Sequence, residues 1–459
     1  MKSPHRTPFL SIRKAAALAG CGLLLASSVF AQVAVESPAF TEPAAPVITA
    51  SEAEALAPEP SPGPPVNAPL AISADGMELP ATGRPVAETP RRFRYTLSAT
   101  MRGIYDDNIN NSSSNHVSDY IFTIEPAIFI GLGTDSDGAN SLSLIYHPSL
   151  FVFASQSRND VVQQVIQLQA GHRFGHLSLS FLQDVQLLDG TDLNSLADPT
   201  GQHANIDVNG RTRHQAYNSQ LSAAYDLTGK LFLTAGGFFT ADQYPSPLVS
   251  SQNFGGNLFL NYIYSDKLTV GLGGTGGFNT TNDPGIFNND QTYEQANLRF
   301  SYNATAKITM SASGGIEVRQ FASGSGDNVS PIYQLAAGYQ PFDGTSLSLS
   351  GSRRTMNSAS LVGQDFAQTT IDFSLTQRFF QRFFVGVAVG YTNSDYFSTI
   401  SGVSANRSDN FYYITPGIDF NVTRFWTFGA FYVYREDSSS VPFSSFTDNQ
   451  VGIRTKLTF

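Results

Sequence analysis

The first candidate for chemistry is a run of oxygen-bearing side chains. Asp106, Asp107 and Asn108, followed by Asn110, offer carboxylate and amide oxygens, the hard ligands that Ca²⁺ prefers in proteins. The same residues are typical of a tight turn, because short polar side chains bond to the backbone around them. We favour the turn, so the sequence predicts no metal site here.

Nucleophiles and bases do not form a recognisable catalytic set. His172 and His176 lie four residues apart, but Gly175 between them indicates a turn, which disfavours a shared metal ion. The serines are many and the seven histidines are scattered, whereas a hydrolase needs one nucleophile oriented by one base. Cys21 is the only cysteine. If it is removed with an N-terminal signal, the mature chain has no thiol and can form no disulfide. We expect a protein that is not an enzyme and needs no cofactor.

The N-terminus is typical of a secretory signal. A basic start precedes an apolar stretch over residues 15–30, and Val29-Phe30-Ala31 provides a cleavage site. We therefore assign residues 1–31 to the signal. Leu18-Ala19-Gly20-Cys21 also matches a lipoprotein box, so a lipidated Cys21 is the alternative. The four basic residues of the signal are Lys2, Arg6, Arg13 and Lys14.

The mature chain is acidic. Without the four basic residues of the signal, 23 Lys and Arg stand against 37 Asp and Glu, a net charge of about −14. Such a chain is a poor partner for a phosphate backbone, so we exclude nucleic acid.

Proline marks the next boundary. Twelve of the 24 prolines fall within residues 32–92, together with many Ala and Glu residues. This composition cannot bury a core and predicts a disordered linker over 32–92. We favour an inert spacer over a segment that binds the peptidoglycan wall, and the second interpretation stays open.

From residue 93 to residue 459 the sequence indicates strands. Charged residues make up only 14% of the chain, against about 25% in soluble domains, and Gly, Ser, Thr, Asn and Gln supply the polarity. In 94–105 apolar and polar residues alternate, with Tyr95 and Tyr105 at the two ends of the apolar face. This pattern is typical of a transmembrane β-strand with an aromatic residue at each interface. A soluble all-β sandwich is the alternative.

The alternation recurs in 18 segments, which predicts an all-β, antiparallel, up-and-down transmembrane barrel of 16–18 strands. The connections support this because they alternate between short turns, such as 228–230 and 265–267, and longer polar segments, such as 106–118 and 398–409. Short periplasmic turns and long outer loops are expected of such barrels. An even strand number also returns both ends of the barrel to the periplasm.

Charges within the predicted strands follow the parity of the polar face. A charge in the middle of the lipid-facing surface would cost about 2–4 kcal/mol, so charges should face the lumen. The residues with this parity are Arg102, Glu125, Asp184, Arg299, Glu317, Arg319, Asp372, Arg378, Asp419, Arg435, Arg454 and Lys456. His172 and Arg353 have the outward parity, and both lie near a strand end.

Three short motifs resemble the start of a known family. Tyr105-Asp106-Asp107-Asn108-Ile109, Ser118-Asp119 and Glu125-Pro126-Ala127 are similar to the opening of the β-barrel porin 2 family, over residues 93–459. The resemblance implies an outer-membrane barrel, and some relatives accompany exopolysaccharide export. The C-terminal Leu457-Thr458-Phe459 resembles the signal read by the barrel-assembly machinery, although its usual glycine is displaced to Gly452.

Three functions are consistent with these features. The first is a passive channel in the outer membrane for small hydrophilic solutes, because 16–18 strands leave an aqueous lumen. The second is an exopolysaccharide export conduit, and the third is a structural or adhesive surface barrel. Expected partners are outer-membrane lipid, the assembly machinery and further copies of the chain. We also hypothesise that the third long segment, 188–211, narrows the pore; its charges are Asp189, Asp192, Asp198, Asp207 and Arg211.

Overall fold

The computed structural model describes residues 93–133, 140–190, 207–208, 210–282, 289–305, 307–323, 326–441 and 443–459. The expected signal, 1–31, and the expected linker, 32–92, lie outside these described residues, as does 191–206 in the third long segment. Leu97 N donates to Phe459 O at 3.1 Å, so the first and last strands begin and end beside each other.

Eighteen strands make up nearly all of the described chain. The helical turn in this part is η1 (Ser157–Asn159). The strands are β1 (Phe93–Asp106), β2 (Asp119–Gly133), β3 (Asn140–Phe153), β4 (Val161–Phe174), β5 (Leu177–Gly190), β6 (Thr212–Asp226), β7 (Leu231–Gln243), β8 (Ser250–Ser265), β9 (Leu268–Asn282), β10 (Gln291–Thr305), β11 (Ile308–Phe321), β12 (Asp327–Tyr339), β13 (Thr345–Asn357), β14 (Gln364–Phe379), β15 (Phe383–Ser398), β16 (Ser408–Asn421), β17 (Trp426–Ser439) and β18 (Phe446–Thr458).

We find no membrane-spanning candidate among the helical elements of the described residues.

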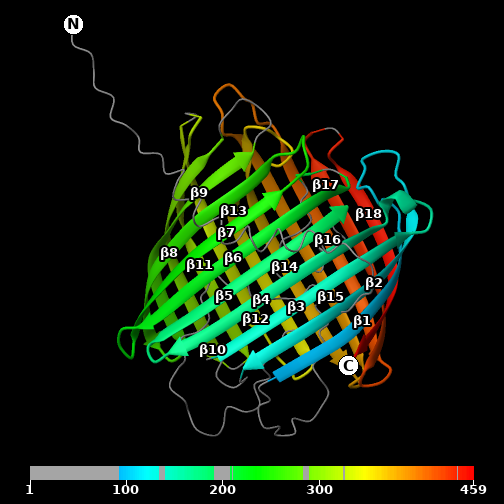
Figure 1. Ribbon diagram of the computed structural model, residues 1–459, viewed down its shortest axis with the longest axis horizontal. Helices are drawn as coiled ribbons and strands as arrows, with labels where there is room; N and C mark the ends of the chain where they lie inside the picture. Colours follow the sequence, from blue (N-terminus) through cyan, green and yellow to red (C-terminus); the bar gives the residue numbers. More distant parts are fainter. Residues whose placement is uncertain are drawn as a thin grey trace. The chain divides into compact units, whose positions relative to one another are not determined.

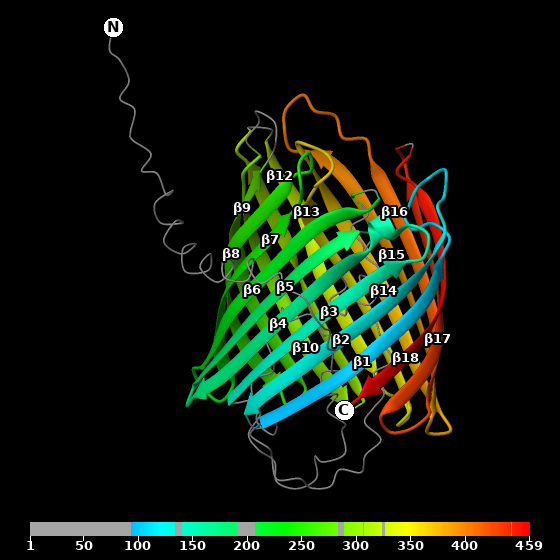
Figure 2. The same ribbon diagram turned by 45° about the vertical axis from the view of Figure 1, so that its right-hand side comes forward.

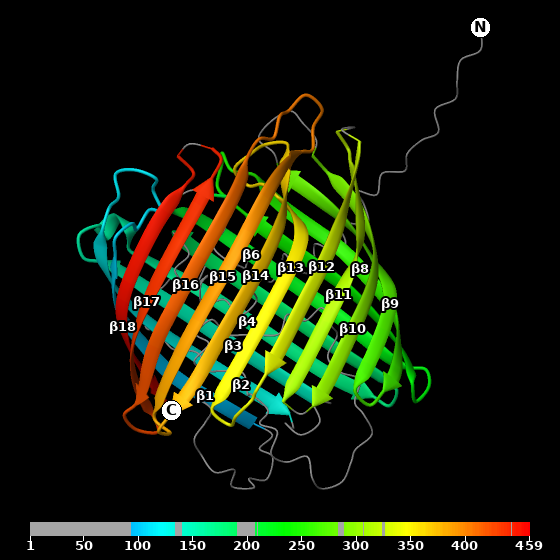
Figure 3. The ribbon, with the colours of Figure 1, turned by 180° about the vertical axis from the view of Figure 1, so that it is seen from behind.

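The strands form one closed antiparallel barrel. Each strand pairs with the next in the chain, and β1 pairs with both β2 and β18. The tilted strands run round the whole ring in Figure 1 and in the turned view of Figure 2, and Figure 3 shows β9 to β18 on the opposite wall. The predicted all-β barrel of about 18 strands is confirmed.

The outer face of the barrel is apolar. On β8, Phe254, Leu258, Leu260 and Tyr262 share this face, and each side chain is exposed. The aromatic rings lie towards the two ends and the leucines lie between them, which is the exterior of a transmembrane barrel. The inner face carries the residues that alternate with these apolar ones along each strand, and they are largely polar, such as Asn253 beside Phe254.

The two ends of the barrel differ. One end, called here the turn end, has short connections such as 266–267 between β8 and β9 and 422–425 between β16 and β17. The other end, called the loop end, has longer ones such as 107–118 and 399–407. The first residue of β1 and the C-terminus both lie at the turn end (Figure 1).

Four prolines within strands interrupt the sheet on one side only, and one of them, Pro148, pairs with β4 but lies in the gap of the β2–β3 ladder. Pro126 and Pro416 pair with β1 and β15, but the ladders to β3 and β17 skip both positions. Pro331 pairs with β11, whereas the β12–β13 ladder ends at Tyr333↔Arg353 and does not resume. Successive residues of a strand point their N–H groups to opposite neighbouring strands. Gln340 N donates to Lys307 O, just before β11, so the nitrogen of Pro331, nine residues earlier, faces β13. A proline has no N–H to offer there.

Candidate functional site: charges and loops of the lumen

The register places the predicted charges on one face of the sheet. Arg102 is paired with Thr123 and Arg454, and the same face continues through every strand of the ring. The residues on it are Arg102, Glu125, Asp184, Arg299, Glu317, Arg319, Asp372, Arg378, Asp419, Arg435, Arg454 and Lys456. This face encloses the lumen, and the outward face carries the exposed apolar residues.

Several of these charges form ion pairs within the wall. Arg102 lies 2.9 Å from Glu125, and Arg454 lies 2.6 Å from Asp419. On β17, Arg435 forms an ion pair with Asp448, and both side chains are fully buried. On β11, Arg319 and Glu317 are 3.0 Å apart.

Four more of the predicted charges bond to neutral groups. The Asp372 carboxylate accepts from Tyr413 Oη at 2.9 Å, and Asp184 accepts from Gln186 at 2.9 Å. Arg299 donates to Asn261 and Thr234 at 2.8 and 2.6 Å, and Arg378 donates to the backbone of Asp343 at 3.3 Å.

Large side chains on the inner face lie over glycines. A Cβ on Gly390 would lie 2.1 Å from the Tyr413 ring, and one on Gly452 would lie 2.4 Å from the Phe431 ring. In both cases the glycine stands directly opposite the aromatic residue on the neighbouring strand. The pairs Phe238–Gly255, Phe259–Gly273 and Tyr293–Gly277 repeat this arrangement. The rings therefore lie along the wall, over backbone that a glycine leaves open.

The family motif, Tyr105 to Asn108, ends β1 and begins the first loop. Asp106 Oδ1 accepts from Asn108 N at 2.8 Å, which is the side-chain-to-backbone bond of an Asx turn. Asp107 accepts from the backbone and side-chain nitrogens of Asn449, both at 2.8 Å. The carboxylates of Asp106, Asp107 and Asp448 lie within 4.8 Å of one another, and Arg435 contacts the last of them. The motif thus joins the first loop to β18.

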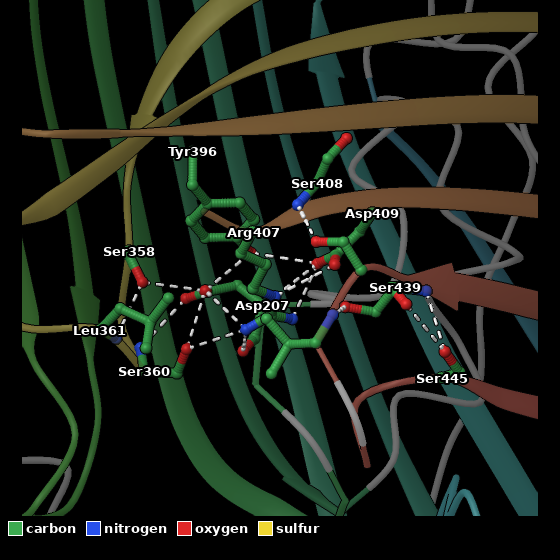
Figure 4. A network of polar contacts seen from close by, with 12 residues as sticks. Asp207, Ser358, Ser360, Leu361, Tyr396, Arg407, Ser408, Asp409, Ser439 and Ser445 are labelled. Carbon is green, nitrogen blue, oxygen red and sulfur yellow. Dashed lines mark hydrogen bonds and ion pairs between the residues drawn. The ribbon is translucent and has the colours of Figure 1, made fainter. Parts of the chain in front are cut away.

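Asp207, near the end of the segment between β5 and β6, lies at the centre of a polar network (Figure 4). Its carboxylate accepts from Ser358 Oγ at 2.9 Å, from Ala359 N at 2.5 Å, and from Ser360 N and Oγ at 3.1 and 2.9 Å. Tyr396 Oη on β15 donates to it at 2.9 Å. Five hydrogen-bond donors contact one buried carboxylate, so Asp207 joins separate loops through a specific network.

Arg407, just before β16, completes the network, which we call the Asp207 latch (Asp207, Ser358, Ser360, Tyr396, Arg407 and Asp409). Its Nη1 lies 3.7 Å from Asp207 Oδ1, and its Nη2 lies 2.8 Å from Asp409 Oδ2. Burial alone would lower the pKa of Arg407, but the hydrogen bond to Asp409 and the surrounding negative charges raise the pKa above its usual value. The guanidinium is therefore a permanent cation in the latch.

The latch joins opposite walls of the barrel. β6 follows the Asp207 segment, and β15 carries Tyr396; the two strands are nine apart in the ring of 18. Asp207 is five positions before Thr212 at the start of β6, a reach of about 18 Å at most. The loops of the far wall must therefore lean inward to meet Asp207.

The β13–β14 hairpin supplies this inward lean. Asn279 on β9 donates to Asn357 at 2.7 Å, and Val249 of the β7–β8 loop donates to Ala359 O at 2.8 Å. Both contacts reach from the end of β13 to strands on the far side of β12. We attribute this inward lean to Pro331, because the β12–β13 ladder stops there and leaves the loop end of β13 free of β12. The described end of the β5–β6 connection, from Asp207, thus meets two other connections, 244–249 and 358–363, inside the loop end.

A cavity of 470 Å³ lies between these three connections. Residues 208 and 211–213 form one side, residues 245–248 form another, and Ser360 of the latch forms a third. The cavity is of a size that accommodates small-molecule ligands. Arg211 turns away towards β3, where its guanidinium lies 4.6 Å from the Phe153 ring.

The sequence missed most of the latch. Asp207 was included among the charges of segment 188–211, but Ser358, Ser360, Tyr396 and Arg407 carried no pattern that pointed to it. The remaining charges of that segment, Asp192 and Asp198, lie outside the described residues, and nothing is described of the Asp189 side chain. At the C-terminus, Phe459 N donates to Leu97 O at 2.6 Å and Leu457 pairs with Ala99, so the predicted assembly signal ends beside β1.

No protein-family model matches this chain. No curated protein matches it either.

Solved structures with a similar course of the chain include three outer-membrane proteins of 9–12% identity, and each of these three covers 80% of this chain. Pseudomonas aeruginosa OpdK, solved with vanillate, is 12% identical over 99% of its own length, with a TM-score of 0.38. P. aeruginosa OccK2 (OpdF) is 11% identical over 98%, with a TM-score of 0.41, and Acinetobacter baumannii OccAB3 is 9% identical over 99%, with a TM-score of 0.40. A likeness this low does not bear on what this chain transports.

Proposed function

We propose that the protein is a passive channel of the bacterial outer membrane for small hydrophilic solutes. The observation that carries the proposal is the closed ring of 18 strands with an apolar exterior and a polar interior. Barrels of 16–18 strands enclose an aqueous channel. The inner aromatic rings lie flat over glycines, so the wall itself does not fill the lumen. Such a channel needs no catalytic group and no cofactor.

The difference between the turn end and the loop end indicates how the barrel would be oriented in the outer membrane. Short turns face the periplasm and long loops face the outside in outer-membrane barrels. The turn end, where β1 begins, would then hold the 32–92 linker in the periplasm, within reach of peptidoglycan. The C-terminal residues Leu457 and Phe459 would be read by the barrel-assembly machinery, and lipid would cover the exterior. Membership of the β-barrel porin 2 family, and a homo-oligomer, remain parts of this proposal.

The Asp207 latch favours small solutes over polymers. The latch and the neighbouring loop contacts tie opposite walls together at the loop end, so a solute must pass beside them. An exopolysaccharide chain would need this network to open throughout export. We therefore place the export conduit second, and the adhesive barrel third.

Electrical recording of the purified, refolded protein in planar bilayers tests the proposal. We expect stepwise conductance increments, together with swelling of protein-containing liposomes in small sugars and none in large dextrans. A protein that inserts, shown by its heat-modifiable band on gels, yet gives neither current steps nor swelling would refute the channel. Equal swelling in sugars and dextrans would refute the loop constriction and favour the polymer conduit.

A further inference from the structure

Two charges of opposite sign face the lumen close to the loop end. Asp242, on β7, is paired with Ala216 and Ser251, on the inner face that also carries Asp184. Arg354, on β13, is paired with Gln368, on the inner face that also carries Asp372. Both residues lie near the ends of their strands, just before connections that meet inside the barrel.

The loop contacts bring these two strand ends together. Val249, seven residues after Asp242, donates its N–H to the carbonyl of Ala359, five residues after Arg354, at 2.8 Å. The Asn279–Asn357 hydrogen bond, 2.7 Å long, pulls the end of β13 in the same direction. Although β7 and β13 are six strands apart, these two contacts bring the loop ends of the two strands close to each other. The lumen is therefore narrow at the level of Asp242 and Arg354.

Both groups remain accessible. The Asp242 side chain is 45% exposed, and Arg354 is exposed too, whereas the ion pairs of the wall are buried. Arg354 is aimed by Gln368 Oε1, which accepts from Nε and Nη2 at 3.3 and 3.1 Å. Beside Asp242, the His214 Nε2 lies 4.0 Å from its carboxylate, and the His214 ring stacks on Tyr244.

We infer that Asp242 and Arg354 make a field across the narrowed lumen that selects zwitterionic solutes. An ammonium group turned towards Asp242 and a carboxylate turned towards Arg354 are both attracted, and the solute keeps its net neutrality. A simple cation is attracted by Asp242 but repelled by Arg354, and a simple anion is attracted by Arg354 but repelled by Asp242. The inference rests on the proposed channel function, and it names the solute class that the constriction prefers.

Glycine and glycolamide test this inference, because they are isomers of equal mass and only glycine is a zwitterion. We measure liposome swelling by each solute at low ionic strength, where charges are least screened. Glycine should enter faster than glycolamide by about fivefold, the factor that corresponds to about 1 kcal/mol. The double variant Arg354→Gln with Asp242→Asn should bring the ratio close to one.

The matched control is Asp184→Asn with Arg378→Gln, which removes one lumen charge of each sign away from the loops. It should keep the wild-type ratio. Single variants add a second readout, since Arg354→Gln should shift the reversal potential in a KCl gradient towards cation preference, and Asp242→Asn towards anion preference. Equal entry of the two isomers into wild-type liposomes would overturn the inference but leave the channel standing. Entry of neither would refute the channel itself.

Discussion

Removing the Asp207 carboxylate is the most direct test of the loop constriction. Asp207→Ala deletes the acceptor for five hydrogen bonds, including those from Ser358 and Tyr396, and removes one of the two carboxylates that pair with Arg407 in the latch. The Asp207 side chain is 1% exposed, so the donors lose a partner that water does not immediately replace.

The magnitude follows from breaking a buried, charged contact. Removing one partner of such a pair typically costs about 3–5 kcal/mol. Taking about 3 kcal/mol, and about 1.4 kcal/mol for each factor of ten, the ratio of latched to unlatched loops falls by roughly a hundredfold. The barrel ladders do not involve Asp207, so the fold and its heat-modifiable band should persist.

Single-channel recording measures the outcome. The wild type should give steady steps, whereas Asp207→Ala should give larger steps with frequent transitions between levels. Arg407→Gln should change the traces in the same direction, because it removes the cation of the same latch. Asp343→Ala, an exposed carboxylate at the turn end, is the control and should leave the traces unchanged. Wild-type steps and noise in both latch variants would refute the idea that the latch limits the pore.

Three further predictions concern the wall. Gly390→Val should lower conductance, because its side chain pushes the Tyr413 ring into the lumen, and a second change, Tyr413→Ala, should restore the conductance; no recovery would contradict the reasoning. Pro331→Val returns an N–H that faces β13, so the β12–β13 ladder should become longer. The β13–β14 hairpin should then move back to the wall and conductance should rise. Unchanged current steps would argue against Pro331 as the cause of the inward lean. Arg102→Ala leaves Glu125 buried without its cation and should lower stability by about 3–5 kcal/mol, more than removal of both residues, as judged by the temperature at which the folded gel band is lost.

The barrel could be predicted from the sequence because its signals are local. Apolar and polar residues alternate with a period of two on every strand, and the wall obeys that period through the whole ring. The sequence could predict that Asp419 and Arg454 share the polar face. Only the register shows that the two side chains meet across Gly429 of β17, the strand between them. The number of strands could be predicted by counting the alternating segments. A closed barrel has no unpaired edge strand, so every such segment must have a neighbour on each side.

The latch could not be predicted because its residues come from three distant parts of the chain. Asp207 and Ser358 are 151 residues apart, and Asp207 and Tyr396 are 189 apart. Neither serines nor tyrosines are unusual in polar loops, so no local pattern marks these two. Pro331 is different, because a proline inside an otherwise regular strand is a readable signal for a broken ladder. The sequence showed the proline without showing which neighbour it would release.

The wall and the loops therefore divide the work of the channel. Buried ion pairs such as Arg102–Glu125 lie within the wall, and rings such as Tyr413 lie flat over glycines, so the wall contributes width. Narrowing arises where the loop end of β13 separates from β12 and brings Arg354 towards the side of the lumen that carries Asp242. Variants in the wall should thus change stability first and conductance second. Variants in the latch and at the Asp242–Arg354 pair should change conductance and selectivity while the barrel stays folded.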